Sequence, residues 1–151
     1  MNELDHLVLI DPKMVPKVPF QNEIKHARIE EIYDGDTVKI IVLFGDVPVR
    51  FSLRILGIDT PEIKQGEGRL PEERQAAIKV RDYLRSLFPK NIAKICIRDW
   101  DKYGGRVLGD LYLPSGENVS DILIYGGWAR AYHGEKKKEW TLDELTKRPF
   151  V

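Results

Sequence analysis

Apolar and polar residues alternate along much of the first half of the chain, which predicts β-strands. In the segment 49–58, VRFSLRILGI, apolar side chains take every second position from Val49 to Ile55. The segment 37–44, TVKIIVLF, alternates in the same way. Because successive side chains of a strand point to opposite faces, a period of two indicates a strand with one buried face.

Three further short apolar segments are also predicted to be strands, at 27–33, 92–98 and 106–113. The first of them is followed by Asp-Gly, which is the strongest short sequence pattern for a β-hairpin. The last two are separated by the turn-like stretch DWDKYGG.

Apolar residues at helical spacing appear only after the first three strands. Pro71 suits the first turn of a helix and Pro89 marks its end. One apolar stripe lies between them, formed by Ala76, Ala77, Val80, Leu84 and Leu87. A second helix is predicted at 119–125, and Thr141 with Glu144 fits a capping box for a short third helix.

The predicted order is three strands, a helix, two strands and further helices, which is typical of an oligonucleotide-binding (OB) fold. We therefore expect a mainly β, α+β domain built on a five-stranded OB-fold barrel with about three helices. A two-layer α+β sheet is the alternative. Residues 1–25 contain PKMVPKVPF and are expected to form a proline-rich, extended segment. Residues 26–151 are expected to form the single domain.

The composition narrows the choice of protein class. Lys plus Arg and Asp plus Glu number 24 each, so the formal net charge is zero, whereas proteins that coat duplexes are usually strongly basic. Cys96 is the single cysteine, which excludes an internal disulfide. The densest basic cluster, EKKKE at 135–139, is expected to be a solvated turn.

No apolar run is long enough to span a membrane, and the start MNELDHLVLIDPK lacks the pattern of a secretory signal peptide. We therefore expect a cytoplasmic protein, with export left open if a leader has been removed. A monomer is expected.

Two acidic residues stand where predicted strands begin and end. Asp36 opens the second strand within YDGDT, and Asp59 ends the third within RILGIDTPE. In an antiparallel meander the start of one strand lies beside the end of the next, so the two carboxylates can meet. Together with the backbone carbonyl of Thr60 they suit Ca²⁺ or Mg²⁺. The alternatives are a turn aspartate and a loop-capping aspartate.

Two arginines and a glutamate could complete a site for phosphoryl chemistry. Arg54 lies on the polar face of the third strand, and Arg106 follows the DKYGG turn. A guanidinium fork matches phosphate oxygens, and Glu62 could orient or deprotonate a water. Each of the three can also be an ordinary solvated charge. No serine or cysteine nucleophile pattern, Walker loop or HExxH motif is present.

The motifs YDGDT, RILGIDTPE and DKYGGR, in this order, resemble the staphylococcal nuclease (thermonuclease) family over about residues 27–132. The resemblance implies an OB barrel and Ca²⁺-dependent, sugar-non-specific hydrolysis of single-stranded or frayed DNA and RNA. In that family the products carry a 3′-phosphate and a 5′-hydroxyl. The alternatives are a catalytically silent oligonucleotide-binding module or a protein-interaction module on the same fold.

The resemblance also assigns roles to residues. It implies that the metal is held by Asp36, Asp59 and the carbonyl of Thr60, with Asp34 as a supporting acid. It implies that Glu62 acts on the attacking water. By the same resemblance, the scissile phosphate is gripped by Arg54 and Arg106.

Three departures from the family pattern bear on these expectations. DKYGGR has one more glycine than the usual DKYGR, so Arg106 keeps its place only if the turn absorbs the extra residue as a bulge. The tyrosines on which nucleotides stack match loosely, with Tyr132 and then Tyr103 as candidates. The zero net charge predicts weak non-specific binding of long polymers and a small salt dependence.

Overall fold

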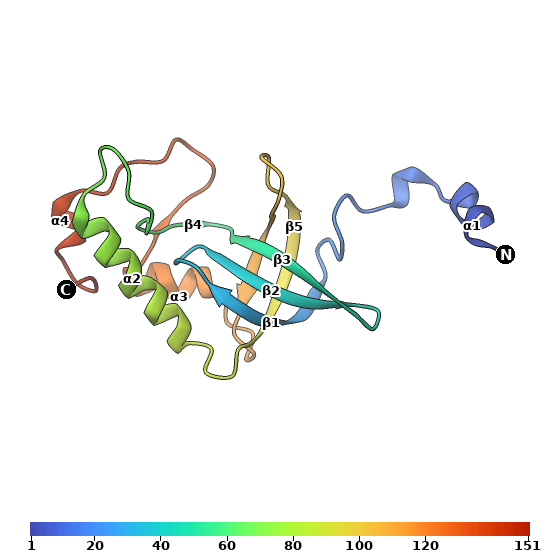
Figure 1. The fold of residues 1–151 in the computed structure, drawn as a ribbon, viewed down its shortest axis with the longest axis horizontal. Helices are drawn as coiled ribbons and strands as arrows, with labels where there is room; N and C mark the ends of the chain where they lie inside the picture. The colour runs from blue at the N-terminus through green and yellow to red at the C-terminus, as the bar shows by residue number, and fades with distance from the viewer.

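Five strands close into a barrel in the computed structural model, which describes residues 1–151 (Figure 1). Their order is β1-β2-β3-β6-β5, and β5 pairs with β1 to close the barrel. β3 and β6 run parallel, and the other neighbours are antiparallel. The strands are Ile24–Ile32 (β1), Thr37–Phe44 (β2), Val47–Ile55 (β3), Ile92–Trp100 (β5) and Val107–Tyr112 (β6). The predicted five-stranded barrel is confirmed.

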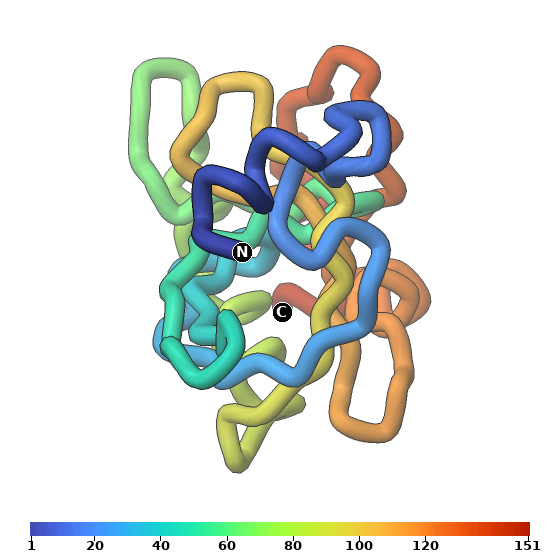
Figure 2. Tube along the Cα trace, turned by 90° about the vertical axis from the view of Figure 1, so that its right-hand side faces the viewer, coloured from blue at the N-terminus to red at the C-terminus, as the bar shows by residue number.

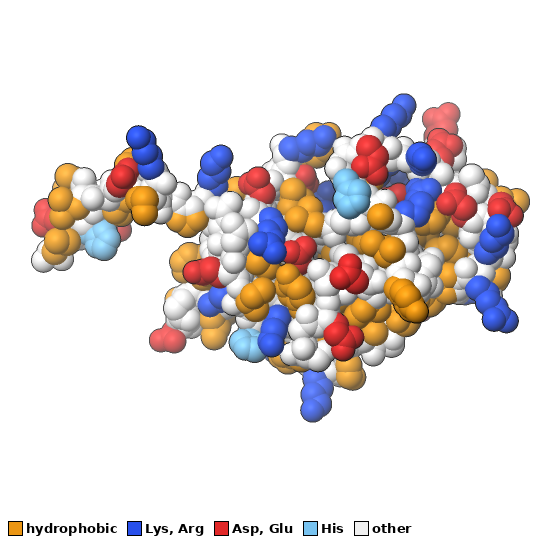
Figure 3. Space-filling model, turned by 180° about the vertical axis from the view of Figure 1, so that it is seen from behind, with side chains coloured by type: hydrophobic (Ala, Val, Ile, Leu, Met, Phe, Trp, Pro, Cys, Tyr) orange, Lys and Arg blue, Asp and Glu red, His pale blue; other side chains and the backbone are white.

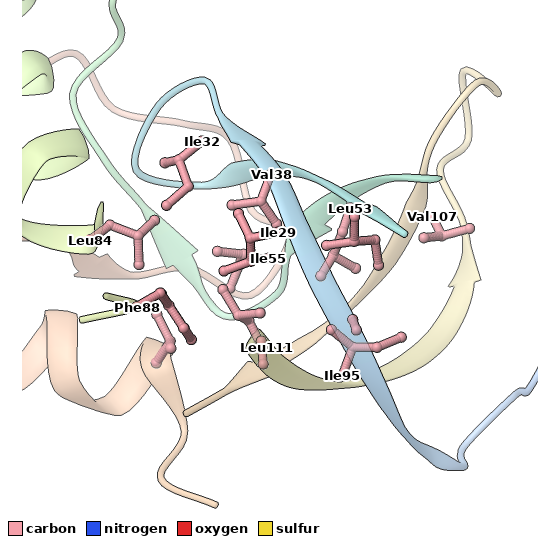
Figure 4. Packing of buried hydrophobic residues seen from close by; sticks show 14 of the residues in the cluster. Ile29, Ile32, Val38, Leu53, Ile55, Leu84, Phe88, Ile95, Val107 and Leu111 are labelled. Carbon is pink, nitrogen blue, oxygen red and sulfur yellow. The ribbon is translucent and has the colours of Figure 1, made fainter. Parts of the chain in front are cut away.

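The alternating patterns bury one face of each strand inside the barrel. In β2 the side chains of Val38, Ile40 and Val42 are buried, and the residues between them are not. Leu53 and Ile55 of β3 pack in the same interior, where Figure 4 shows them close to Val38. The resulting core cluster has 20 buried residues, and burial of this apolar surface is the main stabilising contribution.

The three helices after the third strand lie where the sequence predicts them. α2 (Pro71–Ser86) packs at one end of the barrel in Figure 1. It buries four residues of the predicted stripe: Ala76, Ala77, Val80 and Leu84. α3 spans Val119–Tyr125, and α4 spans Leu142–Leu145 with the capping box of Thr141 and Glu144 formed.

The segment predicted as one strand at 49–58 is two elements, so the prediction is wrong at its end. β3 stops at Ile55, and β4 (Ile58–Asp59) pairs with β7 (Arg130–Ala131) in a separate two-stranded sheet. Gly57 lies between β3 and β4 with φ of +86°, a conformation that favours glycine and ends a strand. Asp59 therefore leaves the barrel.

The chain before β1 projects away from the barrel in Figure 1. It carries α1 (Glu3–Leu9) and a short 3₁₀ helix at Pro12–Met14, where the proline content predicted an extended segment. A capping box between Asn2 and Asp5 starts α1, which lies entirely before the first proline of the segment, Pro12. None of the helices combines the length and the apolar character that a bilayer crossing requires.

The part of this segment nearest β1 is attached to the barrel. Val18 is buried in the main core cluster. The backbone N–H of Asn22 donates to the carbonyl of Ile97 at 2.9 Å, and Trp100 Nε1 donates to the carbonyl of Lys17 at 3.0 Å. The division of the chain at residue 25 stays a prediction.

Three loops project on the same side of the barrel in Figure 1 and in Figure 2, at 60–70, 101–106 and 132–140. They come from segments far apart in the sequence. Positive and negative side chains are interspersed over the face drawn in Figure 3, consistent with the zero net charge. The predicted site residues lie on these loops and at the strand ends below them.

Candidate active site

The turn between β1 and β2 holds two buried carboxylates. Asp34 Oδ1 accepts hydrogen bonds from the backbone N–H groups of Asp36 (3.1 Å) and Thr37 (3.0 Å), which is how aspartate stabilises a turn. Thr37 Oγ1 donates to Asp36 Oδ1 at 3.0 Å. Asp34 therefore builds the turn, and the strand that follows orients Asp36.

Gly35 allows this turn to press against the segment after β4. A Cβ atom on Gly35 would lie 2.9 Å from Thr60 Oγ1 and 2.5 Å from Val80 Cγ1. Such distances leave no room for a side chain, so close approach requires the glycine. The contact joins the turn that carries Asp36 to the segment that carries Asp59, and both carboxylates are buried, with 4% of each residue exposed.

Arg54 connects the end of β3 to the acidic turn. Its Nη2 atom lies 3.6 Å from Asp36 Oδ2 and donates to the carbonyl of Ile58 at 2.9 Å. Its Nη1 atom donates to the carbonyl of Ile55. The side chain is buried, so the alternative of a solvated strand arginine does not hold. The guanidinium is fixed between the acidic turn and β4.

Arg106 stands at the base of the hairpin between β5 and β6. Gly104 and Gly105 both have positive φ, +75° and +79°, a conformation that glycine adopts without strain. Asp101 N donates to the carbonyl of Arg106 at 2.9 Å and closes the hairpin. Arg106 Nε also donates to Asp101 Oδ2 at 2.6 Å.

Both arginines line one groove with a volume of about 970 Å³. The same groove is lined by Tyr103 and Tyr132, the two predicted stacking residues. Tyr103 is 81% exposed on the hairpin, and Tyr132 is half-buried, with its N–H donating to the carbonyl of Gly57 at 2.9 Å. The groove thus combines guanidinium groups with aromatic rings, as single-stranded nucleic acid sites do. The roles of the tyrosines stay predictions.

Glu62 lies on the loop after β4 and is fixed through its backbone. Its N–H donates to Glu73 Oε2 at 2.8 Å, and Arg69 Nη1 donates to the same oxygen at 2.9 Å. Burial, followed by the charge of Asp36, raises the pKa of Glu62. Burial raises the pKa of Asp34 to about 8, with a further contribution from Asp36. Burial is thus the main cause of both shifts, and the negative charge of Asp36 adds to each.

Two cations that the sequence analysis did not single out lie against the acids. Arg130 pairs with Asp59 across β4 and β7, with Nη2 2.7 Å from Asp59 Oδ2. Lys137 Nζ lies 3.8 Å from Asp59 Oδ1 and 3.8 Å from Glu62 Oε1. β7 has only two residues, so no alternation of apolar and polar residues could have identified it, or Arg130, from the sequence. The EKKKE cluster drew attention to Lys137 without indicating which lysine turns inward.

The oxygen donors around Asp36 and Asp59 suit a divalent cation in their chemistry. No group of three or more His, Cys, Asp or Glu side chains is placed to hold a metal by itself. Asp36, Asp59 and the Thr60 carbonyl are all hard oxygen donors, and Thr60 Oγ1 beside them is buried without a hydrogen-bond partner. Oxygen donors of this kind fit Ca²⁺, with water or substrate filling the remaining positions. The metal-ligand roles of these residues stay predictions.

Comparisons with known proteins place the chain among nuclease relatives. The family model described as staphylococcal nuclease homologue matches residues 52–148. An uncharacterized endonuclease of Escherichia coli is 31% identical over 107 residues, which is 71% of this chain and 61% of that protein. Endonuclease YhcR of Bacillus subtilis (strain 168) is 29% identical over 110 residues, 69% of this chain and 9% of that protein. The chain thus matches about six tenths of the first relative's length and a small part of the second.

Proposed function

The chain belongs to the staphylococcal nuclease homologue family, and from this membership we propose that it is a nuclease that hydrolyses phosphodiester bonds in DNA, RNA or both. The names of its relatives as endonucleases support the proposal. The observation that carries it is the groove that Arg54 and Arg106 both line, because Arg54 is also 3.6 Å from Asp36. Arg54 thus links the groove, where we propose that the phosphate binds, to the buried carboxylate of Asp36.

The two arginines are proposed to bind the scissile phosphate. A guanidinium can donate two parallel hydrogen bonds to phosphate oxygens. Arg54 is already oriented by the carbonyls of Ile55 and Ile58, so little reorganisation is needed when negative charge develops on the phosphoryl oxygens. Arg106 would exchange its bond to Asp101 for a bond to the substrate.

Ca²⁺ is the proposed cofactor, held by Asp36, Asp59 and the carbonyl of Thr60. When bound, the cation would offset charge on the phosphate and help to activate a water. Glu62 is proposed to orient that water and accept its proton, and a raised pKa makes the carboxylate a better base. Release of a 3′-phosphate and a 5′-hydroxyl is proposed from the family resemblance.

The test is digestion of single-stranded DNA and RNA in Ca²⁺ and then in a chelator, with analysis of the 3′ ends. Ca²⁺-dependent cleavage leaving 3′-phosphates is expected. Arg54→Ala should lower turnover by about 100-fold or more. Arg50→Ala is the matched control, since Arg50 lies on the same strand with a side chain 70% exposed and paired with Glu30. Absence of Ca²⁺-dependent cleavage from about pH 7 to about pH 10 would rule the proposal out.

A further inference from the structure

One lysine of the exposed EKKKE cluster forms ion pairs with acids of the candidate site. The loop after β7 carries the cluster, and its middle lysine, Lys137, turns toward the acids. Its Nζ atom is equidistant from Asp59 Oδ1 and Glu62 Oε1, at 3.8 Å from each. One ammonium group therefore lies between two carboxylates. In the proposed function Asp59 binds the metal and Glu62 orients the water.

Lys137 also connects two neighbouring cavities. A pocket of about 260 Å³ contains Asp59, Glu62 and Glu73, and the groove of about 970 Å³ contains Arg54 and Arg106. Lys137 is the residue that lines both. Its side chain is 43% exposed, so the flexible stem can carry the ammonium from one cavity to the other.

Electrostatics disfavours the present position of the ammonium once a metal binds. A divalent cation bound to Asp59 would share a carboxylate with a positive charge already within ion-pair distance. Like charges at such separations repel strongly at a partly buried site. Arg130 is held by Glu144 and by the carbonyl of Lys138 as well as by Asp59, whereas both ion pairs of Lys137 are 3.8 Å long. The lysine is therefore the cation that can leave the carboxylates, and the adjoining groove offers it a substrate phosphate beside the two arginines. On the way it passes the Tyr132 ring, whose centroid is 5.7 Å from Nζ.

We propose that Lys137 is a substrate-binding residue that exchanges the carboxylates of Asp59 and Glu62 for a nucleic-acid phosphate when the metal binds. The inference rests on the proposed function and extends it to a residue outside the family motifs quoted above. Before metal binding, Lys137 neutralises the two acids. After metal binding, it adds a third positive charge to the groove. Metal and substrate therefore strengthen each other's binding through one side chain.

Lys137→Met tests the proposal because it keeps the length of the side chain and removes the charge. The first readout is calorimetric titration with Ca²⁺ alone, without nucleic acid. Loss of the competing ammonium should lower the Kd for Ca²⁺ by about 3- to 10-fold. Lys136→Met is the matched control, since Lys136 is the exposed neighbour in the same cluster. The Kd of this variant for Ca²⁺ should equal that of the unmodified protein.

The second readout is binding of a single-stranded oligonucleotide whose methylenephosphonate linkages keep the charge but resist hydrolysis, in saturating Ca²⁺. Lys137→Met should bind it several-fold more weakly, and the slope of log K against log salt should be smaller by about 0.7, the value for one phosphate contact on a single strand. Lys137→Arg should keep the slope. A purely structural role for Lys137 would not tighten metal binding while weakening oligonucleotide binding.

The outcomes separate the two proposals. If the unmodified protein binds Ca²⁺ and cleaves, and Lys137→Met matches it in both the Kd for Ca²⁺ and the salt slope, the role of Lys137 is overturned and the nuclease proposal stands. If the unmodified protein neither binds Ca²⁺ nor cleaves, both proposals fail. The proposed exchange of Lys137 is supported if Lys137→Met binds Ca²⁺ more tightly and has a smaller salt slope, while Lys136→Met shows neither change.

Discussion

Gly35 illustrates how a single residue sets the spacing of the site. The Asp-Gly pair suggested a glycine chosen for the conformation of a hairpin turn. In the structure the glycine is needed because Thr60 and Val80 occupy the space that a Cβ would take. The turn can therefore touch the segment after β4, and the charges of Asp36 and Asp59 both raise the pKa of Glu62.

Gly35→Ala should consequently destabilise the protein and disturb the site together. Overpacking at a contact of 2.5 Å to Val80 Cγ1 is expected to lower the free energy of unfolding by about 1–3 kcal/mol, measured by urea denaturation. Gly66→Ala is the control, because a Cβ there meets only Arg69, at 3.9 Å. Equal stability of the two variants would contradict the steric explanation.

Asp34 makes the stability of the metal-free protein depend on pH. Burial raises its pKa to about 8, from the ordinary value of 3.8 for an aspartate. Over this interval the folded chain holds a proton that the unfolded chain has released, so stability falls as pH rises through the interval. The contribution of Asp34 to the free energy of unfolding is fully present below its pKa in the unfolded chain. It is lost once pH passes its pKa in the folded chain.

Asp34→Asn should therefore flatten the pH dependence. An asparagine Oδ1 can still accept the hydrogen bonds from Asp36 and Thr37, but the side chain cannot ionise. Urea midpoints measured in chelator between about pH 5 and about pH 8 should decline less steeply in the variant than in the unmodified protein. Parallel curves for the two proteins would show that Asp34 does not hold the proton.

At the scale of elements, β7 and α4 converge on Asp59 through one arginine. Arg130 donates to Asp59 Oδ2 at 2.7 Å, lies 3.4 Å from Glu144 of α4, and stacks 3.8 Å from the Trp140 ring centroid. These contacts link a metal-ligand candidate on β4 to the last helix. α4 therefore supports Asp59 without lining the groove that holds the two arginines, whereas Tyr132 and Lys137, between β7 and α4, do line it.

Arg130→Ala should reduce stability by about 1–3 kcal/mol, because it removes the closer of the two cations that pair with the buried Asp59 carboxylate. Thermal unfolding measures the loss. Ca²⁺ should restore part of it, since a bound cation replaces the missing positive charge. Arg81→Ala provides the comparison, because Arg81 pairs with an exposed aspartate, Asp82, and should change stability little. A loss that Ca²⁺ does not reduce would argue against Asp59 as a ligand.

Regular elements could be predicted from sequence, whereas contacts between distant loops could not. The alternation in 37–44 predicted β2 with its observed ends, and the Thr141–Glu144 pattern predicted the cap of α4. The end of β3 was missed because Gly57 changes the chain direction. The positions of Arg130 and Lys137 depend on how β7 pairs with β4, and nothing local in the sequence encodes that pairing.

At the scale of the whole molecule, the chain divides into a barrel and a projecting N-terminal segment. The side chains of α1 and of the 3₁₀ helix after it are all unburied. Burial begins at Val18, which is 2% exposed. The projecting residues therefore contribute little to the core, whereas the residues just before β1 belong to it.

Removal of residues 1–16 should change the free energy of unfolding by less than about 0.5 kcal/mol. Val18→Ala in the full chain should lower it by about 1–3 kcal/mol, because it opens space in the core. Urea denaturation of both variants checks the contrast. If removing residues 1–16 costs as much as Val18→Ala, the projecting segment packs on the barrel in solution.

The pairing of Asp59 with Arg130 joins residues 71 positions apart. During synthesis, Asp36, Arg54 and Asp59 leave the ribosome well before Arg130 and Lys137. Until those later residues arrive, Asp59 lacks its counter-ion, and β4 has no strand to pair with. The site is therefore completed only late in translation. Until then, a nascent chain holds Asp36 and Asp59 near its own messenger RNA without the ion pairs of Arg130 and Lys137.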